Sequence, residues 1–296
     1  MKAEDYRIGK TKKVRLAAYR TAPPDDAVKA DYIGEEFDRR LAELAEWQER
    51  LYAENKYGLV VVLQARDAAG KDSLIKKVFA HLNIQGVHVA NFKQPTAEES
   101  DHDYLWRINK ALPARGDIAI FNRSHYEDVL VTRVHDLLET GPFPNELIES
   151  DIWQERYRQI NDWERYLTEN GIFVLKFFLH VSRETQAERL VERIRRPEKN
   201  WKFSYTDISE RRLWDEYSNI YGDMLAATST ETAPWYVIPA DKKWYTRYLV
   251  LDIVTAFMRR LAPQYPEPTG KEKEELMRWK RYLAEEKDIN LADLWM

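Results

Sequence analysis

The residues best suited to chemistry lie in one short segment, residues 64–73. Small residues fill most of it up to Gly70 and Lys71, and Asp67 lies inside it. The backbone N–H groups of such a loop, and of a helix that starts after it, point at one spot where the helix dipole adds positive potential. Small residues let the backbone approach an anion closely, and Lys71 adds a full charge with three donors. The segment therefore predicts a phosphate-binding loop (P-loop).

Two positions depart from the usual pattern of such a loop. Ala65 stands where the first glycine is common, and Asp72 stands where a serine or threonine normally binds magnesium. We interpret Asp67 as a carboxylate that takes over part of the metal binding, because magnesium favours carboxylate and phosphate oxygens. The alternative is a chance Gly-Lys pair at a helix start. The predicted phosphate-binding residues of the loop are Ala68, Ala69, Gly70, Lys71, Asp72 and Ser73.

A second polar segment, residues 122–128, follows another apolar run. Arg123 is well placed to neutralise a phosphate, and Asn122 can bind metal-coordinated water without adding charge. Glu127 or Asp128 would orient an acceptor or bind a metal through water. The alternative is a helix cap followed by a solvated acidic turn.

Basic residues form two further groups. Arg193, Arg195, Arg196 and Lys199 lie beside Pro197 in a segment without a clear period, as in a mobile basic lid over a phosphoryl group. The alternative is a basic helix end that complements the helix dipole. A track leading away from the loop is predicted from Lys76, Lys77, Lys93, Lys110 and Arg133, with solvated surface side chains as the alternative.

These segments are positioned by alternating strands and helices. Strands are expected near residues 58, 87, 117, 172 and 235, and helices over residues 34–55, 98–112, 146–169, 183–196, 207–227, 244–261 and 271–287, with Asp207 as a cap. This alternation predicts an α/β fold, a five-stranded parallel sheet flanked by helices on both faces. Ligands bind at the carboxyl ends of such strands, so the polar segments should converge. We divide the chain into an N-terminal arm (1–32), either loose or packed, a P-loop kinase domain (33–262, lid about 193–206) and a C-terminal extension (263–296).

Composition narrows the class of protein. Of the 296 residues, 32% are charged, 44% are hydrophobic and none is cysteine, which excludes disulfides, a thiol nucleophile and cysteine metal sites. The net charge of −4 argues against a general nucleic-acid binder. The charged start lacks the apolar stretch of a signal peptide, and no apolar run approaches membrane-spanning length. We therefore expect a cytoplasmic protein with no nucleic-acid or membrane partner.

With these motifs together, the chain resembles the polyphosphate kinase 2 family. The resemblance rests on residues 65–72, 121–128 and the basic lid 193–199, and it runs from about Ile33 to Leu261. It implies a fold like that of thymidylate kinase, magnesium (or manganese) as the cofactor, and inorganic polyphosphate as the phosphoryl donor. Residues 122–128 look most like the subgroup that accepts both AMP and ADP, which implies reversible formation of ADP and ATP. We also expect a homo-oligomer, a dimer or a tetramer.

Carried over residue by residue, the resemblance implies a role for each motif position. Asp67 would bind magnesium and orient the acceptor phosphate, Lys71 would hold the transferring group, and Arg123 would grip the acceptor phosphate. The implied catalytic set is Asp67, Lys71, Asn122, Arg123, Arg193 and Arg196, and the implied nucleotide-binding set is Arg123, Tyr126, Glu127, Asp128 and Arg195. Asn122, which replaces an aspartate of other subgroups, leaves any second carboxylate ligand open.

Two rival functions remain open at this point. An ATP-dependent nucleoside-monophosphate kinase would have a similar fold and loop, although Asp67 and Ala65 argue against it. A nucleotide-gated scaffold without useful catalysis has less use for a lid rich in arginine. The phosphoryl donor separates the first rival from a polyphosphate-dependent enzyme, and turnover separates the second.

Overall fold

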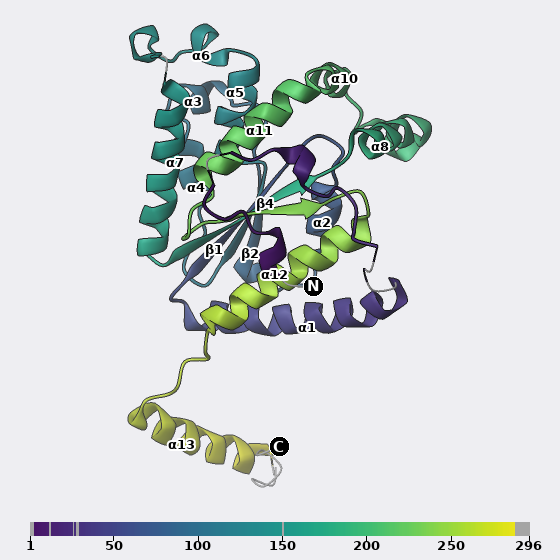
Figure 1. Ribbon diagram of the computed structural model, residues 1–296. Helices are drawn as coiled ribbons and strands as arrows, with labels where there is room; N and C mark the ends of the chain where they lie inside the picture. The colour runs from purple at the N-terminus through teal and green to yellow at the C-terminus, as the bar shows by residue number, and fades with distance from the viewer. Residues whose placement is uncertain (1–2, 12, 26, 28–29, 150, 288–296) are drawn as a thin grey trace. The chain divides into compact units, whose positions relative to one another are not determined.

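A five-stranded parallel sheet lies at the centre of the molecule (Figure 1). The computed structural model describes residues 3–11, 13–25, 27, 30–149 and 151–287. The strands are β1 (Gly58–Ala65), β2 (Val87–Asn91), β3 (Ile118–Asn122), β4 (Ile172–His180) and β5 (Trp235–Pro239). They are ordered β2-β3-β1-β4-β5, and every neighbouring pair is parallel. The predicted α/β fold is confirmed, with β1 in the middle.

The helices connect these strands in chain order. The α-helices are α1 (Ala30–Glu54), α2 (Lys71–Val78), α3 (Ala97–Ser100), α4 (Trp106–Lys110), α5 (Val131–Val134), α6 (Leu137–Thr140), α7 (Ile152–Glu169), α8 (Arg183–Arg195), α9 (Pro197–Asn200), α10 (Tyr205–Arg212), α11 (Trp214–Thr228), α12 (Lys243–Leu261) and α13 (Gly270–Lys287). Short 3-10 segments are η1 (Ala3–Tyr6), η2 (Leu16–Ala18), η3 (Ile84–Gly86), η4 (His125–Val129) and η5 (Asn145–Leu147). No described helix is long and apolar enough to cross a membrane.

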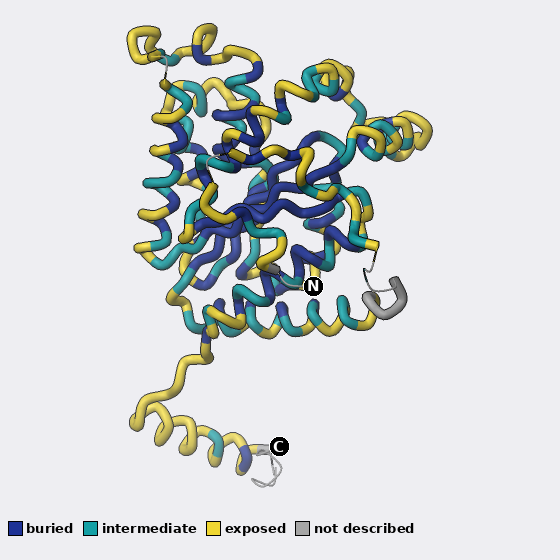
Figure 2. The backbone as a smooth tube through the Cα atoms, viewed as in Figure 1, coloured by how far each residue is buried: buried dark blue, intermediate teal, exposed yellow. Residues whose placement is uncertain are grey.

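Helices cover both faces of the sheet because alternate strand residues face opposite ways. Leu59, Val61 and Leu63 of β1 pack with α1, α2 and α12, whereas Val60 and Val62 pack with α4, α7 and α11. All of β1 is buried, as the dark blue centre of Figure 2 shows. Burial on both faces explains why the strand reads as an unbroken apolar run.

The N-terminal arm packs against the domain in its described part. Ile8, Val14 and Leu16 are buried. The Ile8 N–H donates to Trp235 O at 2.8 Å, and Arg7 forms an antiparallel bridge with Tyr236. The arm thus covers the outer edge of β5, which would otherwise expose unpaired backbone groups.

Three predicted helices differ from the structure, and in two of them a short polar side chain accepts a backbone N–H where the difference lies. The helix over residues 98–112 is broken into α3 and α4, where Asp103 Oδ1 accepts the Leu105 N–H. The helix expected from residue 146 begins at Ile152, after η5. The helix over residues 207–227 is two helices, and Ser204 rather than Asp207 is the N-cap of the first one.

The chain divides into two compact units, Met1–Pro263 and Gln264–Met296. The first contains the sheet, the predicted phosphate loop and the predicted lid. The second contains α13, while residues 288–296 of the predicted extension lie outside the described residues.

Candidate active site

The phosphate loop connects β1 to α2 at the carboxyl end of the central strand. Ala68 and Gly70 both have positive φ, 60° and 115° respectively. Gly70 is the N-cap of α2 in the left-handed region, where a residue without a Cβ has little cost. This conformation turns the chain sharply into the helix, so the first N–H groups of α2 face the end of the strand.

Lys71 curls back over its own loop. Its Nζ donates to Ala65 O at 3.0 Å, which closes the turn between strand and helix. Burial lowers the pKa of Lys71, with a further contribution from Arg123, while Asp67 acts in the opposite direction. The ammonium is therefore poorly hydrated, which strengthens its interaction with an anion.

Arg123 joins the two polar segments. It follows β3 with φ 65°, and its N–H donates to Leu63 O of β1 at 3.1 Å. Its Nη2 lies 2.9 Å from Asp67 Oδ1. Burial alone would lower the pKa of Arg123, but Glu127 and Asp67 together raise it. Residues 56 positions apart in the sequence thus form one ion pair beside Lys71.

Glu127 lies behind this pair. Burial raises its pKa, although Arg123 and Lys71 oppose that effect. In the orientation that satisfies its neighbours, the buried amide of Gln64 donates to Glu127 Oε1 at 2.9 Å and accepts from Ser124 Oγ at 3.1 Å. Gln64, the last polar residue of β1, was not singled out from the sequence.

Asp72 and Asn122 meet where α2 begins. The Asn122 amide donates to Asp72 Oδ1 at 3.1 Å and to Asn91 Oδ1 at 2.9 Å. Lys202, from the predicted lid, lies 2.9 Å from Asp72 Oδ2. Burial alone would raise the pKa of Asp72, but Lys202 and Asn122 lower it. The lid therefore reaches the phosphate loop through Lys202, a residue that the sequence analysis missed.

The lid arginines are paired with carboxylates or exposed. Arg193 Nη1 lies 3.1 Å from Asp207 Oδ2, and Arg196 Nε lies 3.2 Å from Glu192 Oε1. Arg195 is exposed. Burial, and then Asp67, raise the pKa of Asp207, with Arg193 opposing them, which places this part of the lid within electrostatic range of the loop.

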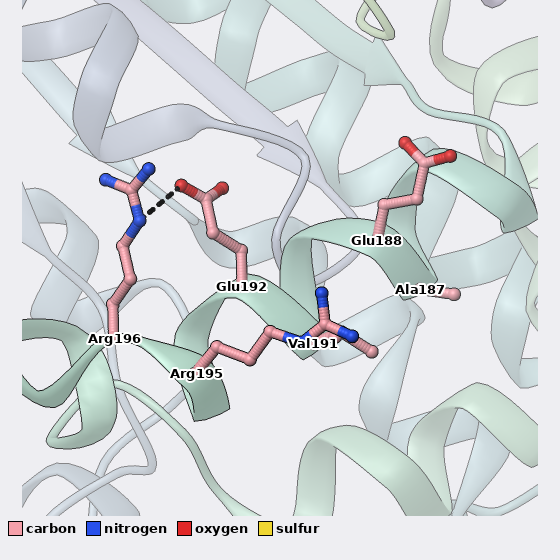
Figure 3. A pocket seen from close by; sticks show the side chains of 6 residues that line it. All are labelled: Ala187, Glu188, Val191, Glu192, Arg195 and Arg196. Carbon is pink, nitrogen blue, oxygen red and sulfur yellow. Dashed lines mark ion pairs between the residues drawn. The ribbon is translucent and has the colours of Figure 1, made fainter.

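A surface hollow of about 530 Å³ lies along α8 and is lined by Ala187, Glu188, Val191, Glu192, Arg195 and Arg196. Figure 3 shows the ion pair of Glu192 with Arg196 at its rim. The hollow does not include Lys71 or Asp67 among its lining residues.

Helix α8 also grips the loop, which the sequence analysis did not anticipate. Arg189 donates to the carbonyls of Ala68 and Ala69 at 3.1 and 2.7 Å. Its other Nη donates to the carbonyls of Ala240 and Asp241 at 2.7 and 3.1 Å. The helical spacing of Gln186, Arg189 and Arg193 was the available signal, since it places the three on one face.

Two more contacts fix the loop. Gln186 Nε2 donates to Asp67 O at 3.0 Å. On the other side, Arg66 stacks 3.9 Å from the centroid of the Trp214 ring and donates to Ser218 Oγ at 2.7 Å. Helix α8 therefore holds carbonyls of the loop and α11 holds the Arg66 side chain, which pre-organises the loop for an anion.

Several predicted site residues are not brought to the loop. Tyr126 is fully buried, and its hydroxyl donates to Glu164 Oε1 at 2.8 Å. This burial corrects its predicted contact with nucleotide. Arg133 pairs with Asp223 of α11 at 3.2 Å, on the face of the sheet opposite α2. It therefore cannot form one track with Lys76 and Lys77.

The remaining predicted residues lie at the edges of the site. Lys76, Lys77 and Lys93 are exposed, and Ser73 Oγ donates to Gly70 O at 3.0 Å. Asp128 lies 3.8 Å from Arg107, and burial raises its pKa to about 6. Asp128 thus interacts with Arg107 of α4 and Arg156 of α7.

The described residues contain no group of three or more His, Cys, Asp or Glu side chains that would hold a metal by themselves. Asp67 contributes one partly exposed carboxylate. Magnesium usually takes one or two carboxylates and completes its shell with substrate phosphates and water. The donor set therefore fits a magnesium ion that arrives with a phosphorylated substrate.

A parallel sheet with a Gly-Lys loop at the end of its central strand, an arginine on the neighbouring strand and a basic lid defines a P-loop phosphotransferase. The sequence model of polyphosphate kinase 2 (PPK2) matches residues 27–284. The chain belongs to the polyphosphate kinase 2 family, and it is a polyphosphate-dependent nucleotide phosphotransferase.

Relatives and a solved structure agree with this assignment. The chain is 40% identical over 96% of its length to an ADP-polyphosphate phosphotransferase of Rhodopseudomonas palustris, of which it covers 99%. It is 49% identical over 80% of its length to an AMP/ADP-polyphosphate phosphotransferase of Meiothermus ruber, of which it covers 84%. The crystal structure of polyphosphate kinase 2 from Arthrobacter aurescens TC1 superposes with a TM-score of 0.83 at 36% identity, covering 93% of this chain and 96% of that one.

Proposed function

We propose that this enzyme transfers phosphoryl groups from inorganic polyphosphate to both AMP and ADP, reversibly, with magnesium. The observation that carries the proposal is the ion pair of Arg123 and Asp67 beside Lys71. In this arrangement Arg123 would bind an acceptor phosphate, Lys71 would bind the transferring group, and Asp67 would bind a metal. All three follow the carboxyl ends of two adjacent strands.

The chain's own residues would act by position and charge. Two polyanions must approach each other, and Lys71 and Arg123 offset their repulsion from two adjacent strand ends. Asp67 orients Arg123 through their hydrogen bond. Lys202, Arg193 and Arg196 add cations from the lid. When bound, magnesium would supply charge neutralisation between phosphate oxygens, with Asp67 as its protein ligand.

Two observations support a dual acceptor. The Meiothermus ruber relative carries both AMP and ADP in its name, and the Rhodopseudomonas palustris relative carries ADP alone. In residues 122–128, Asn122 itself adds no charge at the end of β3, and its amide donates to Asp72 and Asn91. An uncharged residue there repels an additional acceptor phosphate less than a carboxylate would.

The test is incubation of the purified protein with polyphosphate and magnesium, with AMP in one reaction and ADP in another. We expect AMP to yield ADP and then ATP, and ADP to yield ATP, as measured by chromatography. Product from ADP but none from AMP would contradict the dual acceptor. Phosphorylation of AMP by ATP, with no transfer from polyphosphate, would favour a nucleoside-monophosphate kinase instead.

A further inference from the structure

We propose that Tyr126, Glu164 and Lys176 form a buried positioning network that fixes the turn carrying Arg123 and Glu127. The three side chains come from η4, α7 and β4, and all are fully buried. Lys176 Nζ lies 2.6 Å from Glu164 Oε2 and 2.9 Å from the Tyr126 hydroxyl. That hydroxyl in turn donates to Glu164 Oε1 at 2.8 Å.

Tyr126, Glu164 and Lys176 have partners for all their donors, whereas the neighbouring buried His125, with Nε2 3.7 Å from Glu164 Oε1, lies outside the network. Lys176 uses its third donor on Thr228 O of α11, at 2.7 Å. Burial alone would raise the pKa of Glu164, but Lys176 lowers it. Full satisfaction in a dry interior makes such a network rigid and directional.

Core packing alone does not require these charges. Lys176 lies in the middle of β4, paired with Val62 of β1 and Trp235 of β5. Buried ion pairs can often be replaced by apolar residues of similar volume without loss of stability. A lysine at this position is therefore better explained by the geometry that it imposes on Tyr126 than by a contribution to folding.

The constrained turn leads directly to the active site. Arg123 has a positive φ of 65°, a conformation that non-glycine residues adopt only when the surroundings hold them. The turn is held at one end by the Arg123 N–H, which donates to Leu63 O. At the other end the Tyr126 N–H donates to Ser124 Oγ, and the Tyr126 hydroxyl joins the network. Between these anchors Arg123 reaches Asp67, and Glu127 lies beside them.

Tyr126 is thus a positioning residue that acts through Arg123. This inference rests on the proposed role of Arg123 in gripping the nucleotide phosphate. Loosening the network should weaken nucleotide binding and turnover. It should leave polyphosphate binding at residues 68–73 nearly unchanged, because Gln186 and Arg189 of α8 hold that loop independently of Tyr126.

The test compares Tyr126→Phe with Tyr157→Phe. Tyr157 is also buried, and its hydroxyl accepts from Arg133 at 3.2 Å, away from the Arg123 turn. Binding of ADP and of tripolyphosphate is measured by calorimetry, well below the melting temperature of each variant. We expect Tyr126→Phe to weaken ADP binding by about tenfold, the scale of one charge-assisted hydrogen bond, while tripolyphosphate binding changes less than about twofold. Tyr157→Phe should change neither.

A second variant removes the charges but keeps the volume. Lys176→Met combined with Glu164→Leu should retain folding, and it should weaken ADP binding as Tyr126→Phe does. The KM for ADP should rise and kcat should fall in both variants, with the KM for polyphosphate unchanged.

Equal ADP affinity in wild type and Tyr126→Phe would overturn the inference, as would equal weakening of both ligands or an equal effect in Tyr157→Phe. A wild-type protein that binds no ADP would also overturn it. A wild type that binds ADP but transfers no phosphate would contradict the proposed function alone, because the calorimetric comparison needs no turnover.

Discussion

At the scale of single residues, two cations of the site are each paired with a carboxylate and a third is not. Asp67 pairs with Arg123, and Asp72 pairs with Lys202. Lys71 instead contacts the neutral carbonyl of Ala65. An incoming phosphate can therefore bind Lys71 without separating an ion pair, which suits the proposed role of this lysine in holding the transferring group.

Substitution of Lys71 or Asp67 should separate activity from folding. We expect Lys71→Ala and Asp67→Asn each to lower the transfer rate by about a hundredfold or more, because each removes a preorganised charge from the site. Melting temperatures should change by only a few degrees, since neither side chain is part of the core. Rates and thermal unfolding are measured for both variants and for Lys13→Ala, an exposed control. Near-wild-type transfer in either site variant would contradict the assigned roles.

Asp128 should make stability depend on pH. Burial raises its folded pKa from 3.8 to about 6, with Arg107 and Arg156 opposing the effect. Between these two values the folded chain binds more protons than the unfolded chain, so this residue's contribution to stability falls as pH rises from about 4 to 7. Asp128→Asn lacks that titration.

The stability of wild type minus that of Asp128→Asn should therefore decrease over this pH range, by on the order of 1–3 kcal/mol. Urea unfolding of both proteins at pH 4.5, 5.5 and 7 measures the difference. A difference independent of pH would show that Asp128 does not titrate there.

At the scale of elements, α8 connects the loop to the lid. Gln186 and Arg189 hold loop carbonyls near its start, and Arg193 pairs with Asp207 of α10 near its end. Since a helix of this length behaves as a rigid rod, displacement of the lid would be transmitted to the loop backbone.

Replacement of Arg189 should consequently lower stability and transfer rate more than replacement of an exposed residue of the same helix. Its removal frees four backbone carbonyls, so Arg189→Ala should destabilise the protein by about 2–3 kcal/mol and lower the transfer rate at least tenfold. Arg189→Lys should not restore the rate, because an ammonium lacks the planar fork that spans both pairs of carbonyls. Glu188→Ala, exposed on the same helix, is the matched control. Full rescue by lysine would show that charge alone suffices.

The strands could be predicted from the sequence, whereas several caps and side-chain contacts could not. All five strands were predicted from the sequence. For β1, β3, β4 and β5, burial leaves a local apolar composition that needs no tertiary information, whereas β2 is a partly exposed edge strand. The turn at Asp103 and the cap at Ser204 were missed, since a short polar side chain can serve a helix interior or a cap equally well. Arg189 was missed because its partners are backbone carbonyls, so only its helical spacing with Gln186 and Arg193 pointed to its role.

At the scale of the whole molecule, the strand order determines which polar segments lie side by side. With β1 between β3 and β4, the loop after β1 lies beside Arg123 from β3 on one side and α8 from β4 on the other. The convergence of polar segments therefore follows from topology, and the N-terminal arm supports it by covering the edge of β5.

The unit Met1–Pro263 contains every residue assigned to the site, which predicts that it works alone. A chain ending at Pro263 should keep its melting temperature within a few degrees and retain turnover per subunit.

Helix α13 carries Leu276, Trp279 and Leu283 at helical spacing, each more than half exposed. We propose that this apolar stripe forms a contact between subunits, so the shortened chain should have fewer subunits per particle than the full chain. Light scattering compares the two, with Lys273→Ala in the full chain as the control for charge changes in α13. An unchanged mass would exclude α13 from the subunit contact, and loss of folding would show that the first unit depends on the second.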